Sequence, residues 1–204
     1  MKPIREWKLV IKYTLEFILV VLGVFLGLFL NQLSENKSNR HLAQTCRNNF
    51  ITEIDSNKAE LAGCYATHRA FFDTIVYLIN AREESLFYNM SFEIPDLTEA
   101  SWQTAVATEG MIYLENQEVI QLSKCYEVQE FLKGIHQKVL DMLMSRTLIE
   151  KFTNPGISRI EIQTELRIIL SYLGNLVRME KSMLDTYDEP LTLLHAGKQG
   201  RKNR

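Results

Sequence analysis

The apolar positions of this chain form two patterns, a continuous run near the amino terminus and seven-residue repeats after it. Residues 17 to 30 read FILVVLGVFLGLFL and contain no charge. At about 1.5 Å per residue this run covers roughly 21 Å, so residues 13 to 33 are needed to cross a hydrocarbon core of about 30 Å. The extension includes Glu16, whose cost near the end of a span is outweighed by the apolar residues. We therefore expect a transmembrane helix over residues 13 to 33.

Basic residues precede this run within a segment of residues 1 to 12, as they do in a secretory signal peptide; they are Lys2, Arg5, Lys8 and Lys12. A signal peptide ends on a small-residue cleavage site, whereas the sequence LNQL follows this run. The segment is therefore interpreted as an uncleaved anchor.

The polar and small residues of the span lie on one side of the expected helix. At 100° per residue, an arc of about 100° contains Lys12, Glu16, Val20, Gly23, Gly27 and Asn31. We call these six positions the transmembrane face. Its two glycines allow two backbones to approach closely, and its polar residues would leave the lipid on contact with another helix. The pattern predicts a homo-oligomer, although G-x-x-x-G also occurs by chance in apolar stretches.

Glu16 allows two interpretations. It could line a pore or a proton path, because carboxylates inside membranes are costly and are usually functional. It could instead pair with Lys12 one turn earlier and reach the interface. Because Glu16 is only one turn inside the boundary, we favour the ion pair.

Beyond the span, apolar residues recur on a heptad pattern that predicts a helix from about Ser38 to Arg82. Its two seams are Ile54, Leu61, His68 and Ile75, and Ile51, Tyr65, Phe72 and Ile79 with Lys58 as the exception. No proline lies between Pro3 and Pro95, so the membrane helix can continue into this one.

Three further helices are expected after a loop over residues 83 to 97, which could hold a short extended piece (LFYNMSFEI). The first, SWQTAVAT, would be capped by Asp96 and Glu99 and stopped by Gly110. The second spans about residues 116 to 151, with seams Cys125, Leu132 and Val139, and Val128, Ile135 and Met142. The third, from Ser158 to about Asp188, carries Leu166, Ile169, Leu173, Leu176, Met183 and Tyr187 on one face.

These elements predict an all-α protein in which one transmembrane helix continues into an antiparallel helical bundle over residues 34 to 189 with coiled-coil-like seams. From Leu191 onward the chain has basic residues and no acidic ones. Residues 190 to 204 are therefore expected to form a disordered basic tail. Gly63, Gly134 and Gly174 fall within helices at a cost of about 1 kcal/mol each, which close helix crossings or kinks would explain.

Composition narrows the function classes. The 204 residues have a mean hydropathy of -0.11, which excludes a multi-spanning transporter, and only four prolines and nine glycines, too few for a many-stranded sandwich. The net charge of -2 gives no reason to expect a nucleic-acid partner.

No catalytic or cofactor motif is present, so we expect no enzyme and no cofactor. Cys46, Cys64 and Cys125 cannot all pair, and no disulfide framework is indicated. Cys64 and His68 are four residues apart and could bind a soft metal, but no second ligand pair exists, which favours core packing and no metal. The other histidines, His41, His136 and His195, are isolated in the sequence.

Two stretches resemble a family of uncharacterised bacterial single-pass membrane proteins. In LEFILVVLGVFLGLFLNQLSEN the matching positions are Glu16, Leu19, Val20, Gly23, Asn31 and Glu35, and in SWQTAVATEGMIYLENQEVIQLSKCYEVQEF they are Trp102, Gly110, Leu122 and Tyr126. This chain departs from the family at Leu33-Ser34, where the family often has Trp. The resemblance implies a membrane-anchored helical protein and no established activity.

The expected function is an interaction or sensing module anchored in the bacterial inner membrane, with the lipid bilayer and a second copy as its partners. The alternative is an oligomeric membrane effector or pore, linked to stress or defence and gated by its helical domain. Four basic residues before the span, against Lys37, Arg40 and Arg47 after it, slightly favour a cytoplasmic amino terminus. The basic tail and the unpaired cysteines favour the opposite orientation.

Overall fold

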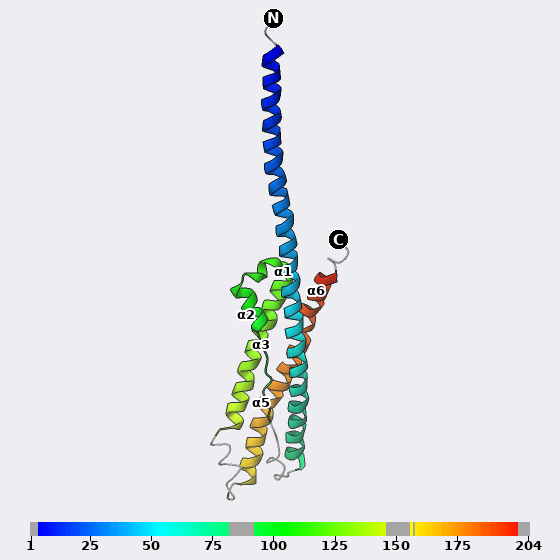
Figure 1. Ribbon diagram of the computed structural model, residues 1–204. Coiled ribbons are helices and arrows are strands. Elements are labelled where there is room, and N and C mark those ends of the chain that lie inside the picture. The colour runs from blue at the N-terminus through cyan, green and yellow to red at the C-terminus, as the bar shows by residue number, and fades with distance from the viewer. Residues whose placement is uncertain (1–3, 82–91, 146–155, 157, 200–204) are drawn as a thin grey trace. The chain divides into compact units, whose positions relative to one another are not determined.

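The computed structural model describes residues 4–81, 92–145, 156 and 158–199. Its helices are α1 (Ile4–Ala81), α2 (Ala100–Ala107), the 3-10 helix η2 (Gly110–Tyr113), α3 (Asn116–Leu143), α5 (Arg159–Thr186) and α6 (Asp188–Gln199) (Figure 1). No strand occurs in these ranges, so the all-α prediction is confirmed. The chain divides into two compact units, residues 1–45 and residues 46–204.

The expected continuity between the membrane helix and the heptad helix is confirmed, because both lie within the single helix α1. In the first unit, every residue from 12 to 38 is exposed, including the whole apolar run. In the second unit, the part of α1 after Thr45 packs with α3, α5 and α6.

The predicted seams of α1 differ in depth. Ile54, Leu61, His68 and Ile75 are fully buried. Along the other seam Ile51 is buried, and Tyr65, Phe72 and Ile79 are half-buried. Lys58, the exception in the pattern, pairs with Asp188 at the edge of the core. The first seam therefore faces the centre of the bundle and the second its border.

The faces predicted for the other long helices also form the core. Cys125, Leu132 and Val139 of α3 are buried, and its second seam is half-buried against them. The six apolar positions predicted for the last helix, Leu166 to Tyr187, are all buried. The predicted end of α3 near Lys151 is wrong, because this helix ends at Leu143 with Met144 as its C-cap. Residues 146 to 151 lie outside the described residues.

Hydrogen bonds between buried side chains define the helix directions. Arg47 bonds Glu118 and Asn57 bonds Gln129, at separations of 71 and 72 residues, so α1 and α3 run parallel. Gln129 accepts a bond from Tyr187, and His136 contacts Glu180, so α5 runs antiparallel to α3. The predicted bundle therefore contains one parallel pair in addition to the antiparallel ones (Figure 1).

A parallel pair requires a connection that returns along the bundle, and residues 92–99 supply part of it. They form neither helix nor strand. The Phe92 ring stacks on the His68 ring with centroids 4.4 Å apart, and the Thr98 backbone exchanges hydrogen bonds with the Asn57 side chain. Six residues of this segment thus accompany eleven of α1, as expected for extended chain beside a helix. Residues 83–91 of the predicted loop lie outside the described residues.

The start of α2 corrects one prediction. Glu99 occupies its N-cap but makes no side-chain cap bond. Instead the Glu53 carboxylate of α1 accepts the Ser101 N–H at 2.8 Å, because that side chain reaches the free donors from the neighbouring helix. The expected box of Asp96 and Glu99 is therefore wrong. The predicted stop at Gly110 also differs, since α2 ends at Ala107, Glu109 is left-handed with φ 55°, and Gly110 opens η2.

The predicted disordered tail over residues 190 to 204 is wrong for its described part. Residues Asp188–Gln199 form α6, in which Leu191 and Leu194 are buried. These leucines continue the i, i+4, i+7 spacing that begins at Tyr187, so α6 extends the buried face of α5. Pro190 lies in the first turn, where a backbone N–H is not needed for the helix. Residues 200–204 lie outside the described part.

Glycines in the second unit fall into two kinds. An added Cβ at Gly63 or Gly134 would meet no atom within 4 Å, so close crossings do not explain these two. At Gly174 it would lie 3.2 Å from the Phe72 ring. At Gly197 it would lie 2.6 Å from Glu118 Oε1 and 2.8 Å from Arg47 Nε, because α6 passes directly over that ion pair.

We predict that alanine has opposite effects at two helical glycines. Gly134→Ala should raise the free energy of unfolding by about 0.5–1 kcal/mol, through helix propensity alone. Gly197→Ala should lower it by about 1–3 kcal/mol, because its Cβ overlaps a buried ion pair. Thermal unfolding of the full-length protein in mild detergent, followed by circular dichroism, measures both. Stabilisation by Gly197→Ala would contradict the packing of α6.

Candidate functional site

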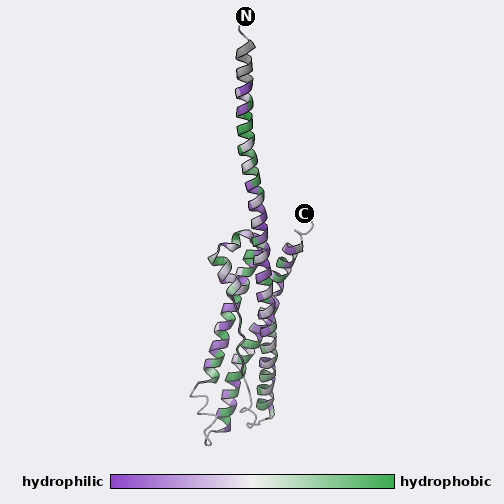
Figure 2. Ribbon diagram, in the orientation of Figure 1, coloured by the Kyte–Doolittle hydropathy of each residue, from purple (hydrophilic) through white to green (hydrophobic). Residues whose placement is uncertain are grey.

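The structure presents two candidate sites, the transmembrane face in the first unit and a group of buried polar side chains in the second. Figure 2 shows the apolar stretch of α1 as a nearly unbroken hydrophobic band. Its 18-residue apolar window has a mean hydropathy of 2.3 and none of it is buried, so α1 is long and apolar enough to cross a membrane. A signal sequence near an amino terminus passes the same test.

All six residues predicted for the transmembrane face are exposed on α1. An added Cβ at Gly23 or Gly27 would meet nothing within 4 Å. Lys12 Nζ lies 3.9 Å from Glu16 Oε1, the i, i+4 pair that the sequence favoured. Val20 and Asn31 lie on the same helix with no protein covering them in the single chain. Association through this face stays a prediction.

Inside the second unit, α1 projects four polar side chains into the core, beginning with Arg47. Its guanidinium donates to both Glu118 carboxylate oxygens, at 2.6 and 2.8 Å, and both residues are buried. Glu118 also accepts the N–H of Glu115 at 2.8 Å, which caps the start of α3. The Glu118 carboxylate therefore caps the first turn of α3 and also links α3 to α1.

Two more polar contacts follow along α1. Glu53 accepts a hydrogen bond from the Tyr126 hydroxyl at 2.5 Å; burial, together with this bond, raises the pKa of Tyr126 and keeps it a donor. Asn57 donates to Gln129 Oε1 at 3.1 Å, and the Tyr187 hydroxyl donates to the same oxygen at 2.7 Å. Arg47, Glu53 and Asn57 of α1 thus each bond a side chain of α3.

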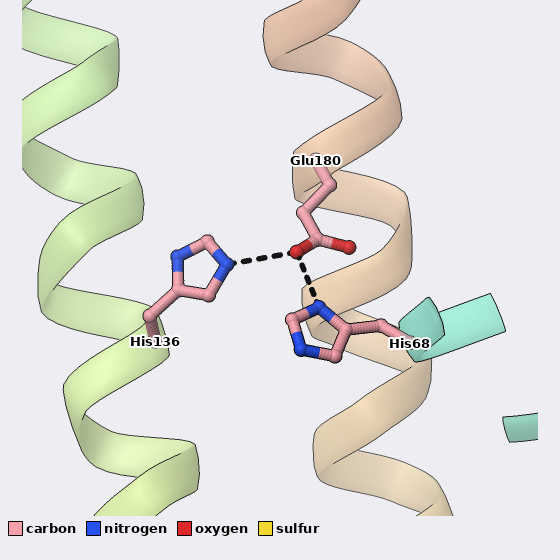
Figure 3. Close-up of side chains that lie close together, drawn as sticks. All are labelled: His68, His136 and Glu180. Atoms are coloured by element: carbon pink, nitrogen blue, oxygen red, sulfur yellow. Dashed lines mark hydrogen bonds and ion pairs between the residues drawn. The ribbon is translucent and has the colours of Figure 1, made fainter. Parts of the chain in front are cut away.

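The fourth polar side chain, His68, belongs to a cluster that joins three helices. Figure 3 shows both histidine rings directed at one carboxylate oxygen of Glu180. His68 Nδ1 of α1 lies 2.6 Å from Glu180 Oε1, and His136 Nε2 of α3 lies 2.8 Å from it. All three side chains are buried. We call these three residues the His–Glu cluster.

The electrostatics of the cluster depend on the Glu180 carboxylate of α5. Burial by itself raises the pKa of Glu180, but hydrogen bonds from His136 and His68 outweigh it and lower the pKa below its ordinary value. The carboxyl is therefore ionised at neutral pH, in the core of the unit. Its second oxygen, Oε2, and His68 Nε2 have no hydrogen-bond partner among the described residues.

The cluster has the composition of a metal site. Histidine nitrogens and a carboxylate oxygen bind Zn²⁺ and related ions. The ligand atoms of the three residues lie within 4.8 Å of one another, and no other such trio occurs in the part of the chain that the structure describes. Cys64, which the sequence paired with His68, is buried nearby on α1 but does not belong to the trio.

The sequence did not predict this cluster, because His68 was considered only with Cys64 and His136 was considered isolated. His136, considered isolated, comes within 5.7 Å of His68 between ring centroids, while His41 and His195 are exposed. The spacing of His136 and Glu180 from apolar residues of their helices did indicate that both side chains face the core. His136 follows Leu132 by four residues and precedes Val139 by three, so it occupies a core position of its helix. Glu180 stands in the same relation to Leu176 and Met183.

Comparison with known proteins adds no assignment. No protein-family model matches the chain, and neither a curated protein nor a solved structure shows significant similarity to it. The resemblance to bacterial single-pass membrane proteins therefore stays an expectation from the sequence.

We predict that Cys64, one turn from His68, is protected from alkylation. Burial, and then the charges of Glu60, Glu93 and Glu180, raise its pKa to about 11. At pH 8 its thiolate fraction would be about 0.1 %, against roughly a quarter for an ordinary thiol, so iodoacetamide should react at least about 100-fold more slowly. Peptide mass spectrometry of the folded protein measures this rate, and the same protein in denaturant is the control. Equal rates would contradict the buried position.

Proposed function

We propose that this chain is a single-pass membrane protein that self-associates through its transmembrane face and whose helical unit acts as an interaction or sensing module. The observation that carries the proposal is the exposed apolar stretch of α1, in which a Cβ added at either of its two glycines would meet no atom within 4 Å. Lipid can cover its apolar side. A second helix can cover the glycine side, where backbones can approach closely.

The polar residues at the two ends of the face support the same proposal. Glu16 and Asn31 share its arc with the glycines, so that contact with a second copy would remove both from lipid. The pair between Lys12 and Glu16 accounts for the carboxylate without a pore. An interaction or sensing role therefore has more support than the effector or pore alternative.

We predict that Gly23→Leu combined with Gly27→Leu weakens self-association at least about tenfold, because the leucines hold the two backbones apart. Energy transfer between labelled full-length chains in detergent micelles measures it. The matched control, Val21→Leu with Phe25→Leu, changes two residues on the opposite side of the helix and should leave the transfer unchanged. A strictly monomeric wild type, or equal association in both variants, would refute the oligomer.

For orientation we propose a cytoplasmic amino terminus in the bacterial inner membrane, following the basic residues before the span. The unpaired cysteines favoured a cytoplasmic helical unit instead. However, Cys64 and Cys125 are buried, and burial raises the pKa of both thiols, which protects them in an oxidising compartment. The basic tail also favoured a cytoplasmic helical unit, but that inference is weaker because residues up to Gln199 form helix α6 and not a free tail.

We predict that a carboxy-terminal alkaline phosphatase fusion is active and that a matching fluorescent-protein fusion is dark, since the helical unit would lie outside the cytoplasm. Both fusions are assayed in the same host at matched expression, determined by immunoblot. The reverse pair of results would place the helical unit in the cytoplasm.

A further inference from the structure

The His–Glu cluster is the strongest unexplained feature of the second unit, because it buries two histidines and a glutamate where apolar residues would pack. Three other buried polar contacts join α1 to α3, namely Arg47 with Glu118, Glu53 with Tyr126, and Asn57 with Gln129. The cluster differs from them because one carboxylate of α5 contacts a histidine of α1 and a histidine of α3. His68 Nε2 and Glu180 Oε2 have no hydrogen-bond partner among the described residues.

The hydrogen bonds of His136 indicate what the cluster could hold. Its Nδ1 lies 3.0 Å from the carbonyl oxygen of Leu132, and its Nε2 lies 2.8 Å from Glu180 Oε1. Both neighbours are acceptors, but a neutral imidazole has only one N–H. When Nδ1 donates to the carbonyl, Nε2 presents a lone pair towards the carboxylate. A second proton or a metal ion must lie between them.

A backbone carbonyl that fixes Nδ1–H is the usual support of a histidine that binds metal through Nε2. Here the carbonyl comes from Leu132, one turn earlier on the same helix. It orients the ring so that Nε2 faces the carboxylate. His68 presents Nδ1 to the same oxygen from α1, and the Phe92 ring stacks on the His68 ring.

We propose that His68, His136 and Glu180 form a binding site for a transition-metal ion of the Zn²⁺ class. The ligand atoms would be His68 Nδ1, His136 Nε2 and the Glu180 carboxylate. The free Oε2 offers a second oxygen for bidentate coordination. Nitrogen and oxygen ligands without thiolate suit Zn²⁺, Co²⁺ and Ni²⁺.

The geometry requires a small expansion. With bonds of about 2.0–2.1 Å at tetrahedral angles, neighbouring ligand atoms are about 3.3 Å apart. The observed contacts of 2.6 and 2.8 Å would therefore open by about 0.5–0.7 Å. Such a change is within the reach of χ rotations in three side chains on separate helices. The bound ion would replace the shared proton and join α1, α3 and α5, whether or not the anchor self-associates.

The first test uses untagged full-length protein in mild detergent, because a histidine tag would bind the same ions. Titration with CoCl₂ should give the intense visible absorption of tetrahedral cobalt, with saturation at one ion per chain. ZnCl₂ should then displace the cobalt and raise the midpoint of thermal unfolding. Both readouts require only the wild-type protein.

Variants then locate the ion. Glu180→Gln keeps the side-chain volume and removes the charged ligand, and should weaken Zn²⁺ binding at least about tenfold in calorimetry. Glu53→Gln is the matched control, a buried carboxylate of the same core with no histidine partner, and should bind as the wild type does. A variant with His41→Ala and His195→Ala removes the exposed histidines and should also bind normally.

Two results would overturn the site. One is a wild type that shows no saturable cobalt spectrum and no zinc-dependent shift of unfolding, which would leave the cluster as a proton-shared ion pair. The other is unchanged zinc affinity in Glu180→Gln. Should that variant fail to fold, shown by circular dichroism without metal, His68→Gln takes its place under the same criterion.

Discussion

The arrangement of the second unit depends on one constraint, that every polar side chain α1 places in the core needs at least one hydrogen-bonding partner. An unpaired buried charge or amide costs several kcal/mol, and breaking a buried ion pair costs roughly 3–5 kcal/mol. Arg47, Glu53 and Asn57 find their partners on α3 at separations of 71, 73 and 72 residues. This nearly constant separation permits only one parallel register of the two helices.

The other elements follow from that register. Glu118 can pair with Arg47 only where it also caps α3, so the start of that helix is set by α1. Glu53 in turn accepts the Ser101 N–H in the first turn of α2. Gly197 lets α6 cross over the Arg47–Glu118 pair, where no side chain would fit. A uniform heptad core would allow slippage by seven residues, and the polar groups prevent it.

The His–Glu cluster joins three helices at one place. It continues the series of polar contacts along α1 and adds a carboxylate from α5. Occupancy by the proposed ion would change the distances between the three helices, and would in this way connect ion binding with the packing of the whole unit. The transmembrane face differs from the cluster, since its residues are exposed and no other part of the chain covers them.

The sequence by itself determined which residues form helices and which of their faces are buried. Heptad spacing identified Ile54, Leu61 and Leu132 correctly, because periodicity is a local property that the chain carries in its order. It also placed the apolar span, since length and composition decide whether a helix can cross a bilayer.

Only the tertiary structure decided the helix directions, the caps and the cluster. Glu53 and Ser101 are 48 residues apart, and His68 and Glu180 are 112 apart, so no local pattern connects them. Helix α6 was missed for a related reason. The basic residues near the carboxyl end of the chain suggested a free tail, whereas Leu191 and Leu194 are buried against the rest of the unit. Contacts between distant residues depend on the register of whole helices, which the satisfaction of buried polar groups sets.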